Sequence, residues 1–144
     1  LSLWLREKYP DLVIGSIGSS GPINNAFDFY QYFQVVEKDI HKYDDANHQN
    51  CAEIIRTALN QIRDGLQSVE GRDELSTLLN TQPALSTTSL DDTILATVFL
   101  PLANSAQYGG LVGNPTIGDL CASVIDPTEP DIRKRLRALI ADPI

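Results

Sequence analysis

The sequence predicts a mostly α-helical chain that opens with a single helix–strand unit of an α/β fold. Two patterns carry this prediction. Residues 1–23 combine a helix-like start, a break at Tyr9-Pro10 and a run rich in Leu, Val and Ile that ends in Ser-Ser-Gly-Pro. Such a run is typical of a short buried strand that follows a helix. From Phe27 onward, apolar residues recur every three or four positions, as they do along one face of an α-helix.

The chain is expected to have three parts. Residues 1–26 form the helix–strand unit, residues 27–126 form an antiparallel-looking helical array, and residues 127–144 form a C-terminal amphipathic helix. The first helix should bury Leu1, Trp4 and Leu5 against a sheet. One strand can neither cover that face nor pair its own backbone hydrogen bonds. The first part therefore predicts a fragment of a larger α/β protein.

The helical array begins with a segment that places Phe29, Phe33, Val36 and Ile40 on one face. A second helix is expected to start at Asn50, because Glu53 stands at the spacing of a capping box. Gly65 weakens the end of that helix. Its apolar stripe comprises Cys51, Ile54, Ile55, Ala58, Leu59, Ile62 and Leu66.

Glycine and proline divide the middle of the chain. Gly71 indicates a turn before a shorter helix over residues 72–80, and residues 81–89 read as a polar loop. The helix after this loop carries Pro101, which must kink it or end it near Leu100.

The glycine-rich stretch 109–113 breaks the chain again. Asn114 as N-cap and Pro115 at the first helical position predict a helix that reaches about Ile125. The tail helix should present its basic residues to water as a solvated face. Its apolar residues are Ile132, Leu136, Leu139 and Ile140, and its basic residues are Arg133, Lys134, Arg135 and Arg137.

Composition excludes several classes of function. The 144 residues carry a net charge of −8 and are 42% hydrophobic, which is typical of a soluble globular protein. An acidic chain repels phosphate backbones, so nucleic-acid binding is disfavoured. No window approaches the ~20 apolar residues of a membrane span, and no motif indicates a cofactor.

Residues 41–48, HKYDDANH, place His41 and His48 on either side of Asp44 and Asp45. Imidazole and carboxylate groups can share a metal ion, but this spacing matches no common ligand pattern. A solvated loop between helices is the better interpretation, and we expect no metal site.

Cys51 and Cys121 lack both metal-ligand spacing and a CxxC redox motif. Two buried thiols and one disulfide fit the two residues about equally well. The residues alone leave this choice open.

The bend Gly18-Ser19-Ser20-Gly21 invites assignment of a nucleophile. Neither serine is flanked by glycines two residues away on both sides, as the nucleophile elbow of many hydrolases requires. Ligands of open α/β sheets bind beyond the carboxyl ends of strands. Ser19 and Ser20 could therefore lie beside a pocket, and a purely structural bend is the competing interpretation.

The opening residues resemble the segment after the catalytic elbow in the prolyl carboxypeptidase family of serine peptidases. The likeness rests on residues 4–10, Trp-Leu-Arg-Glu-Lys-Tyr-Pro, on Val13 and Gly15, and on residues 20–23, Ser-Gly-Pro-Ile. That family includes lysosomal Pro-X carboxypeptidase, dipeptidyl peptidase II and thymus-specific serine protease.

The resemblance continues over about residues 1–125. Residues 28–32, 51–56 and 119–121 resemble successive helices of the family's cap, and the Asp-Phe-Tyr form at 28–30 favours its thymus-specific branch. The tail after Asp126 shows no such likeness.

The resemblance implies a fragment of an α/β-hydrolase fold with a helical cap, a Cys51–Cys121 disulfide, and a secreted or lysosomal location. It also implies a Ser-Asp-His peptidase that often cleaves after proline near a peptide end. The serine would lie upstream of Leu1, and the Asp and His would lie downstream of Ile144. No catalytic residue is therefore assigned to this chain, which should be inactive alone. Its partner would be a peptide substrate of the full-length protein, and a homodimer is allowed.

Two other classes of function stay open at this point. One is a non-catalytic helical interaction domain whose first residues only imitate a hydrolase, which predicts free thiols. The other is a different α/β-hydrolase chemistry, such as that of an esterase.

Overall fold

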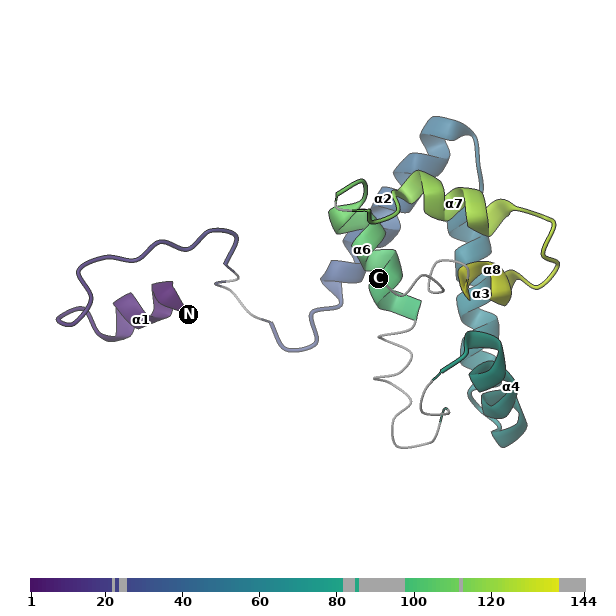
Figure 1. The fold of residues 1–144 in the computed structure, drawn as a ribbon, viewed down its shortest axis with the longest axis horizontal. Coiled ribbons are helices and arrows are strands. Elements are labelled where there is room, and N and C mark those ends of the chain that lie inside the picture. Colours follow the sequence, from purple (N-terminus) through teal and green to yellow (C-terminus); the bar gives the residue numbers. More distant parts are fainter. Residues whose placement is uncertain (22, 24–25, 82–84, 86–97, 112, 138–144) are drawn as a thin grey trace. The chain divides into compact units, whose positions relative to one another are not determined.

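The computed structural model describes residues 1–21, 23, 26–81, 85, 98–111 and 113–137. The chain divides into two compact units, Leu1–Gln31 and Tyr32–Ile144, which Figure 1 colours along the sequence. Each unit is described by itself below.

The first unit contains the predicted opening helix, α1 (Ser2–Lys8). The chain then turns at Tyr9, whose N–H donates to the carbonyl of Leu5 at 2.9 Å. The Ser2 hydroxyl donates to the carbonyl of Ile17 at 3.0 Å, which ties the following segment back to the start of the helix.

The strand expected after α1 does not form in the described residues of this unit. Leu12 and Ile17 are instead 82% and 92% exposed. The apolar run has the composition of a strand, but a strand needs a neighbour to accept and donate its ladder hydrogen bonds. Leu1, Trp4 and Leu5, which were expected to be buried, are also exposed. So is Phe29, which was expected to share the apolar face of the next helix.

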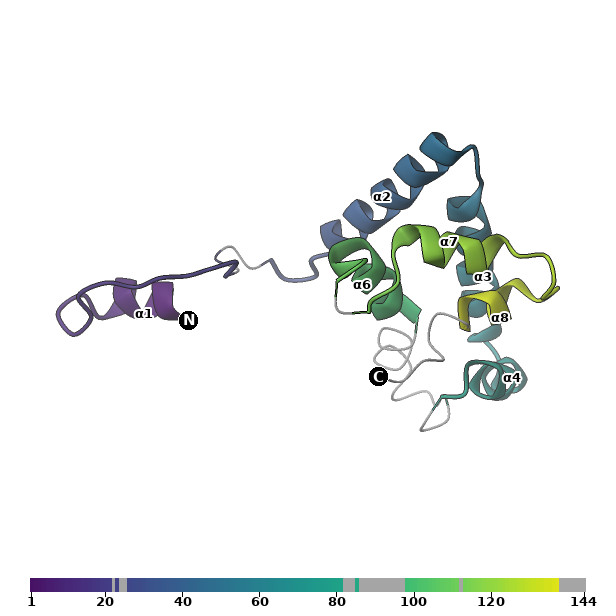
Figure 2. The same ribbon diagram turned by 45° about the horizontal axis from the view of Figure 1, so that its top comes forward.

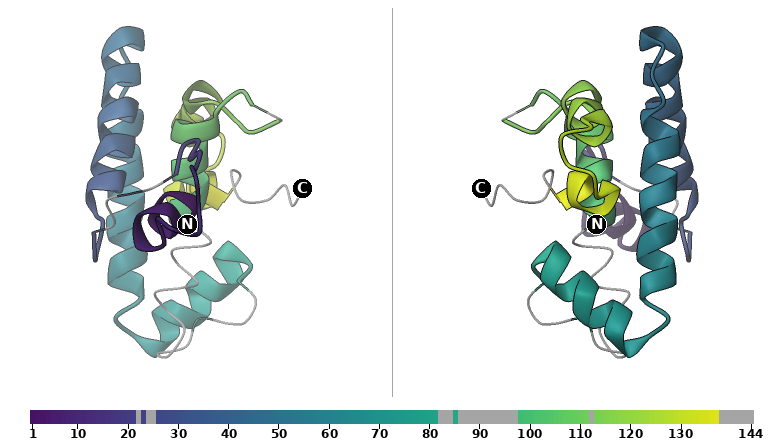
Figure 3. Two further views of the ribbon diagram at one scale, coloured as in Figure 1. Left: turned by 90° about the vertical axis from the view of Figure 1, so that its left-hand side faces the viewer. Right: turned by 90° about the vertical axis from the view of Figure 1, so that its right-hand side faces the viewer.

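The second unit is helical throughout its described part. Figure 2 shows α2 and α3 joined by a short turn, and Figure 3 shows α4 following the opposite end of α3. α3 is the central helix, because α4, α7 and α8 all pack on it. The helices are α2 (Gln31–Asn47), α3 (Cys51–Gly65), α4 (Val69–Leu79), α6 (Leu100–Tyr108), α7 (Ile117–Ile125) and α8 (Ile132–Arg137).

The core of this unit follows the predicted stripe of α3. Of that stripe, Ile54, Leu59 and Leu66 are partly buried and the rest are buried. Leu75 of α4 and Leu120 of α7 are fully buried against it. The other buried apolar residues of the cluster are Val36, Ile40, Ala52, Leu78, Leu79, Leu85, Val98, Leu102, Ala103, Cys121, Val124 and Leu136.

Three helix starts differ from the sequence-based expectation. α4 begins at Val69, so Gly71 lies in its first turn, where its N–H donates to the Ser68 hydroxyl at 3.0 Å. A Cβ on Gly71 would lie 2.1 Å from the carbonyl oxygen of Gly65. The glycine therefore permits close approach of the backbone rather than a turn between the helices.

The second difference concerns Pro101, which does not end a helix near Leu100. It stands in the first turn of α6, where proline is tolerated because its missing N–H has no partner to lose. Residues 90–97, where the helix expected after the loop 81–89 would begin, lie outside the described part, as do most residues of that loop. A kink of that helix at Pro101 therefore stays a prediction.

The third difference concerns α7. Its N-cap is Thr116 rather than Asn114, and a capping box with Asp119 makes the difference. The Thr116 hydroxyl accepts the N–H of Asp119 at 3.1 Å, and the Asp119 carboxylate accepts the N–H of Thr116 at 2.8 Å. Two backbone donors at the helix start are thus satisfied at once.

The tail helix α8 belongs to the same core, because it packs on α3, α4 and α7. Its basic residues are not simply a solvated face. Arg133 forms ion pairs with Glu74 at 2.7 Å and Asp131 at 2.9 Å. Arg135 donates to the carbonyls of Glu129 and Val124. Guanidinium donors thus satisfy acceptors at the C-terminal end of α7, while Lys134 stays exposed.

Candidate functional site

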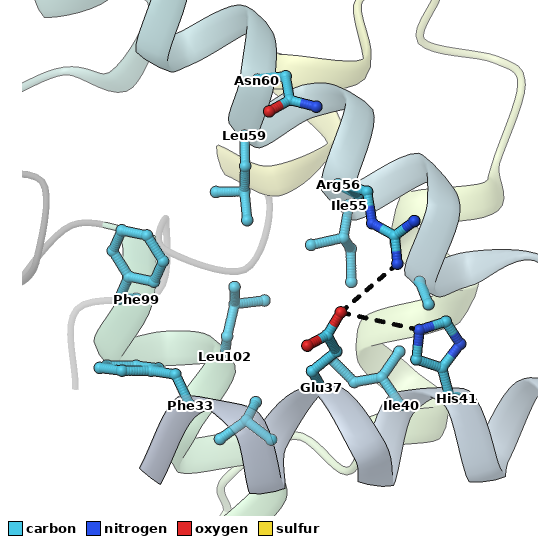
Figure 4. A pocket seen from close by; sticks show the side chains of 12 residues that line it. Phe33, Glu37, Ile40, His41, Ile55, Arg56, Leu59, Asn60, Phe99 and Leu102 are labelled. Carbon is cyan, nitrogen blue, oxygen red and sulfur yellow. Dashed lines mark hydrogen bonds and ion pairs between the residues drawn. The ribbon is translucent and has the colours of Figure 1, made fainter. Parts of the chain in front are cut away.

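The second unit contains an open groove of about 300 Å³ between α2, α3 and α6. Figure 4 shows the side chains that line it. The apolar periodicity of the sequence predicted that most of the apolar lining residues lie on helix faces. It did not predict that three such faces would leave a groove between them. Its apolar lining comprises Phe33, Val36 and Ile40 of α2, Ala52, Ile55 and Leu59 of α3, Phe99, and Leu102 of α6.

Two phenylalanines form an aromatic wall of the groove. The rings of Phe33 and Phe99 meet edge to face with centroids 5.3 Å apart. This arrangement is favoured between aromatic rings and gives the wall a defined shape. Tyr32 continues the contact on the far side of Phe33 at 5.4 Å.

The polar edge of the groove centres on Glu37. Its carboxylate lies 3.4 Å from the Arg56 guanidinium and 3.9 Å from Nε2 of His41, as the dashed lines in Figure 4 show. Arg56 also pairs with Glu53 at 3.1 Å. These side chains are about half exposed, so such pairs contribute little to stability. They form a polar edge at which the groups of a ligand could replace water as hydrogen-bond partners.

The described lining of the groove pairs a histidine with a carboxylate. His41 beside Glu37 resembles the base and orienting carboxylate of a catalytic triad. None of the twelve lining residues, however, carries a hydroxyl or thiol that this histidine could activate.

A second constellation joins α2, α3 and α7. Cys51, the first residue of α3, forms a disulfide with Cys121 of α7, with their Cα atoms 5.4 Å apart. The disulfide expected from the family resemblance is therefore present in the structure. Both cysteines are fully buried.

The loop expected over residues 41–48 is wrong, because α2 continues to Asn47. Asp44 lies on its inner face and is buried. Its carboxylate accepts the N–H groups of Cys51 at 2.9 Å and Ala52 at 2.8 Å. Asn50 holds the N-cap position of α3 but makes no side-chain hydrogen bond there. The cap comes from the preceding helix, which the spacing of a local capping box could not reveal.

Asp44, Cys51 and Cys121 place ligand-type atoms within 4.8 Å of one another. The two sulfur atoms are bonded together, and both carboxylate oxygens already accept backbone N–H groups. The cluster is therefore accounted for without a metal ion. His41 stands at the groove edge, and His48 lies in the turn after α2 with φ at 55°.

Ser19 and Ser20 lie in the first unit and are exposed. Ser20 adopts φ of 52°, in the left-handed region, which fits a sharp bend of the chain. A position beside a pocket stays a prediction for both serines. Among the described residues, no helix is both long and apolar enough to cross a membrane.

Comparison with known proteins gives one family. The family described as Serine carboxypeptidase S28 matches residues 1–141, which extends the likeness beyond Asp126 into the tail. Two inferred serine proteases of Caenorhabditis elegans are each 32% identical, over 96% and 76% of this chain and 27% and 21% of their own length. Mouse thymus-specific serine protease is 25% identical over 87% of this chain and 25% of its own length.

The chain thus spans about a quarter of the length of the curated relatives it matches. No solved structure matches it significantly.

Proposed function

Because the chain belongs to the Serine carboxypeptidase S28 family, we propose that it is part of a serine-type exopeptidase that cleaves near proline at peptide ends. The family match across residues 1–141 is the observation that carries this proposal. The names of its relatives, which describe serine proteases, support it.

The catalytic residues are proposed to lie in other parts of the parent protein. The serine would stand in a Gly-x-Ser-x-Gly elbow just before Leu1, and the Asp and His would follow Ile144. The groove supports this placement of the catalytic residues elsewhere, because its described lining offers apolar contact and no nucleophile. The exposed apolar run after α1 supports an α/β-hydrolase core, since it would gain strand partners there.

The second unit is proposed to act as a cap that controls access of peptides to the site. Its apolar groove and half-exposed polar edge suit contact with peptide side chains. The disulfide supports a secreted or lysosomal location, because such bonds persist mainly in oxidising compartments. It also counts against the interaction-domain alternative, which predicts free thiols.

The first experiment compares this chain with the longer parent protein. We expect the parent to hydrolyse peptides with a free terminus near proline and to lose activity when the elbow serine is replaced by alanine. The isolated chain should hydrolyse none of them. Hydrolysis by the isolated chain that a serine-directed inhibitor abolishes would contradict the placement of the nucleophile.

The cap's role is tested in the parent with two variants that introduce the same indole ring. Leu59→Trp narrows the groove, whereas Val69→Trp places the same ring at an exposed position of α4. Leu59→Trp should raise KM for peptides several-fold with little change in kcat, and Val69→Trp should change neither. Equal kinetics for the two variants would show that the groove does not contact substrate.

A further inference from the structure

We propose that the buried carboxylate of Asp44 protects the Cys51–Cys121 disulfide from attack by thiols. The proposal rests on three groups that the fold brings together. Both cysteines are fully buried, Asp44 is buried beside them, and its carboxylate lies within 4.8 Å of the two sulfur atoms. The charge and the bond therefore share an environment from which water is largely excluded.

The position of Cys51 would ordinarily make a cysteine reactive. It is the first residue of α3, and the unpaired N–H groups of a helix N-terminus stabilise a thiolate there. A thiolate is the group that leaves when a disulfide is attacked. A disulfide at such a position is thus expected to exchange readily.

Asp44 removes that advantage in two ways. Its carboxylate occupies the N–H groups of Cys51 and Ala52, at 2.9 and 2.8 Å, so these donors cannot turn to a sulfur anion. Its negative charge also repels any thiolate that forms within 4.8 Å. Asp44 is consequently a positioning residue that caps α3 and keeps Cys51 from behaving as a reactive cysteine.

The reaction that Asp44 opposes is exchange with a dithiol. One thiolate of the dithiol forms a bond to a cysteine sulfur while the Cys51–Cys121 bond breaks, and the displaced sulfur leaves as a thiolate that takes up a proton. The second thiol of the reagent then displaces the other cysteine. The dithiol is oxidised to a cyclic disulfide, and its two electrons pass to the pair of cysteines.

The test measures the rate of reduction of the folded chain by a dithiol and by a neutral phosphine, with released thiols counted over time. Asp44→Asn keeps an acceptor oxygen and removes the charge, and Asp45→Asn removes a charge at the exposed neighbouring position. We expect Asp44→Asn to speed reduction by the dithiol about tenfold. The leaving sulfur carries roughly half a charge in the transition state, and a unit charge acts on it at an effective dielectric constant of about 20. Asp45→Asn should change the rate less than twofold.

Loss of stability alone could also speed reduction, so two measurements separate the causes. The gain from Asp44→Asn should be larger for the anionic dithiol than for the neutral phosphine, because only the dithiol is itself repelled by the carboxylate. Ile62→Val, a buried change at the other end of α3, lowers stability without altering charge. The proposal would be overturned if Asp44→Asn raised the rates of reduction by both reagents equally. It would also be overturned if Ile62→Val, compared at the same free energy of unfolding, raised the rate with the dithiol as much as Asp44→Asn does.

Discussion

Removal of the Cys51–Cys121 disulfide should lower the stability of the helical unit strongly. The bond closes a loop over a sequence separation of 70 residues. In the chain-entropy treatment, a loop of this length restricts the unfolded chain enough to contribute about 4.4 kcal/mol at 25 °C. Typical domains are stable by only about 5–15 kcal/mol, so the bond supplies a large fraction of the total.

The structure determines which replacement gives a clean measurement. Both sulfur positions are fully buried, and a serine hydroxyl there would be desolvated without an assured partner. The double variant Cys51→Ala, Cys121→Ala therefore isolates the crosslink better than serine does. It leaves in place the two hydrogen bonds that the Asp44 carboxylate accepts from the N–H groups of residues 51 and 52.

The assay is equilibrium unfolding in urea of the oxidised chain and of the double variant, followed by far-UV circular dichroism. The free energy of unfolding should fall by about 3–5 kcal/mol, and the m-value should rise because an uncrosslinked unfolded chain exposes more surface. A fall below about 1 kcal/mol with an unchanged m-value would refute the reasoning. It would mean that the unfolded chain already keeps α3 and α7 together, so that the crosslink restricts little.

Three further changes test other contacts of the same unit. Gly71→Ala should lower the free energy of unfolding by more than 2 kcal/mol, because its Cβ would lie 2.1 Å from the Gly65 carbonyl oxygen; a urea midpoint equal to that of the parent chain would contradict this close approach. Hydrogen bonds from Thr116 lower the pKa of Asp119, so the capping box stabilises the fold fully above the unfolded pKa of 3.8 and its contribution is lost as pH falls through the lower folded value. The difference between the urea midpoints of the parent chain and Asp119→Asn should accordingly be constant well above pH 3.8 and shrink as the pH falls below it, and a difference that does not change with pH would disprove the link. Arg133→Met removes a guanidinium whose pKa is raised by its hydrogen bonds to Asp131 and Glu74; it should speed amide hydrogen exchange in α8 while leaving α2 unchanged, and equal exchange in both helices would show that the pair does not anchor the tail.

The sequence predicted the helices of the second unit well where one face is buried. The stripe of α3 follows a single rule, since residues three and four positions apart share a face and the core requires that face to be apolar. Helix starts were predicted less well, because a capping partner can come from elsewhere in the chain. Asp44, seven residues before Cys51, replaces the cap that Asn50 was expected to supply.

The groove shows the same limit at the level of the site. Phe33 and Ile55 were each predicted to lie on an apolar helix face, and any such face is expected to be covered. Whether two faces close completely on each other depends on the angle and spacing of whole helices, which periodicity does not encode. The prediction that Arg133 and Arg135 lie on a solvated face was wrong for a related reason. A basic stripe looks solvated in sequence, but Arg135 reaches carbonyl oxygens of Val124 and Glu129 that only the packed fold brings near.

The predicted strand at residues 12–17 fails for a different reason than the helix starts. A strand needs a second segment to pair with, whereas a helix forms its hydrogen bonds within one segment. Residues 12–17 have the composition of a buried strand, yet Leu12 and Ile17 are exposed in the unit that contains them. Their backbone groups can be satisfied by water, while their side chains gain nothing from burial without a neighbouring segment. An apolar run of this kind in a folded protein is expected to be covered. The relatives are about four times as long as this chain, and we expect their remaining residues to correspond to the segments that pair with this run in the parent protein.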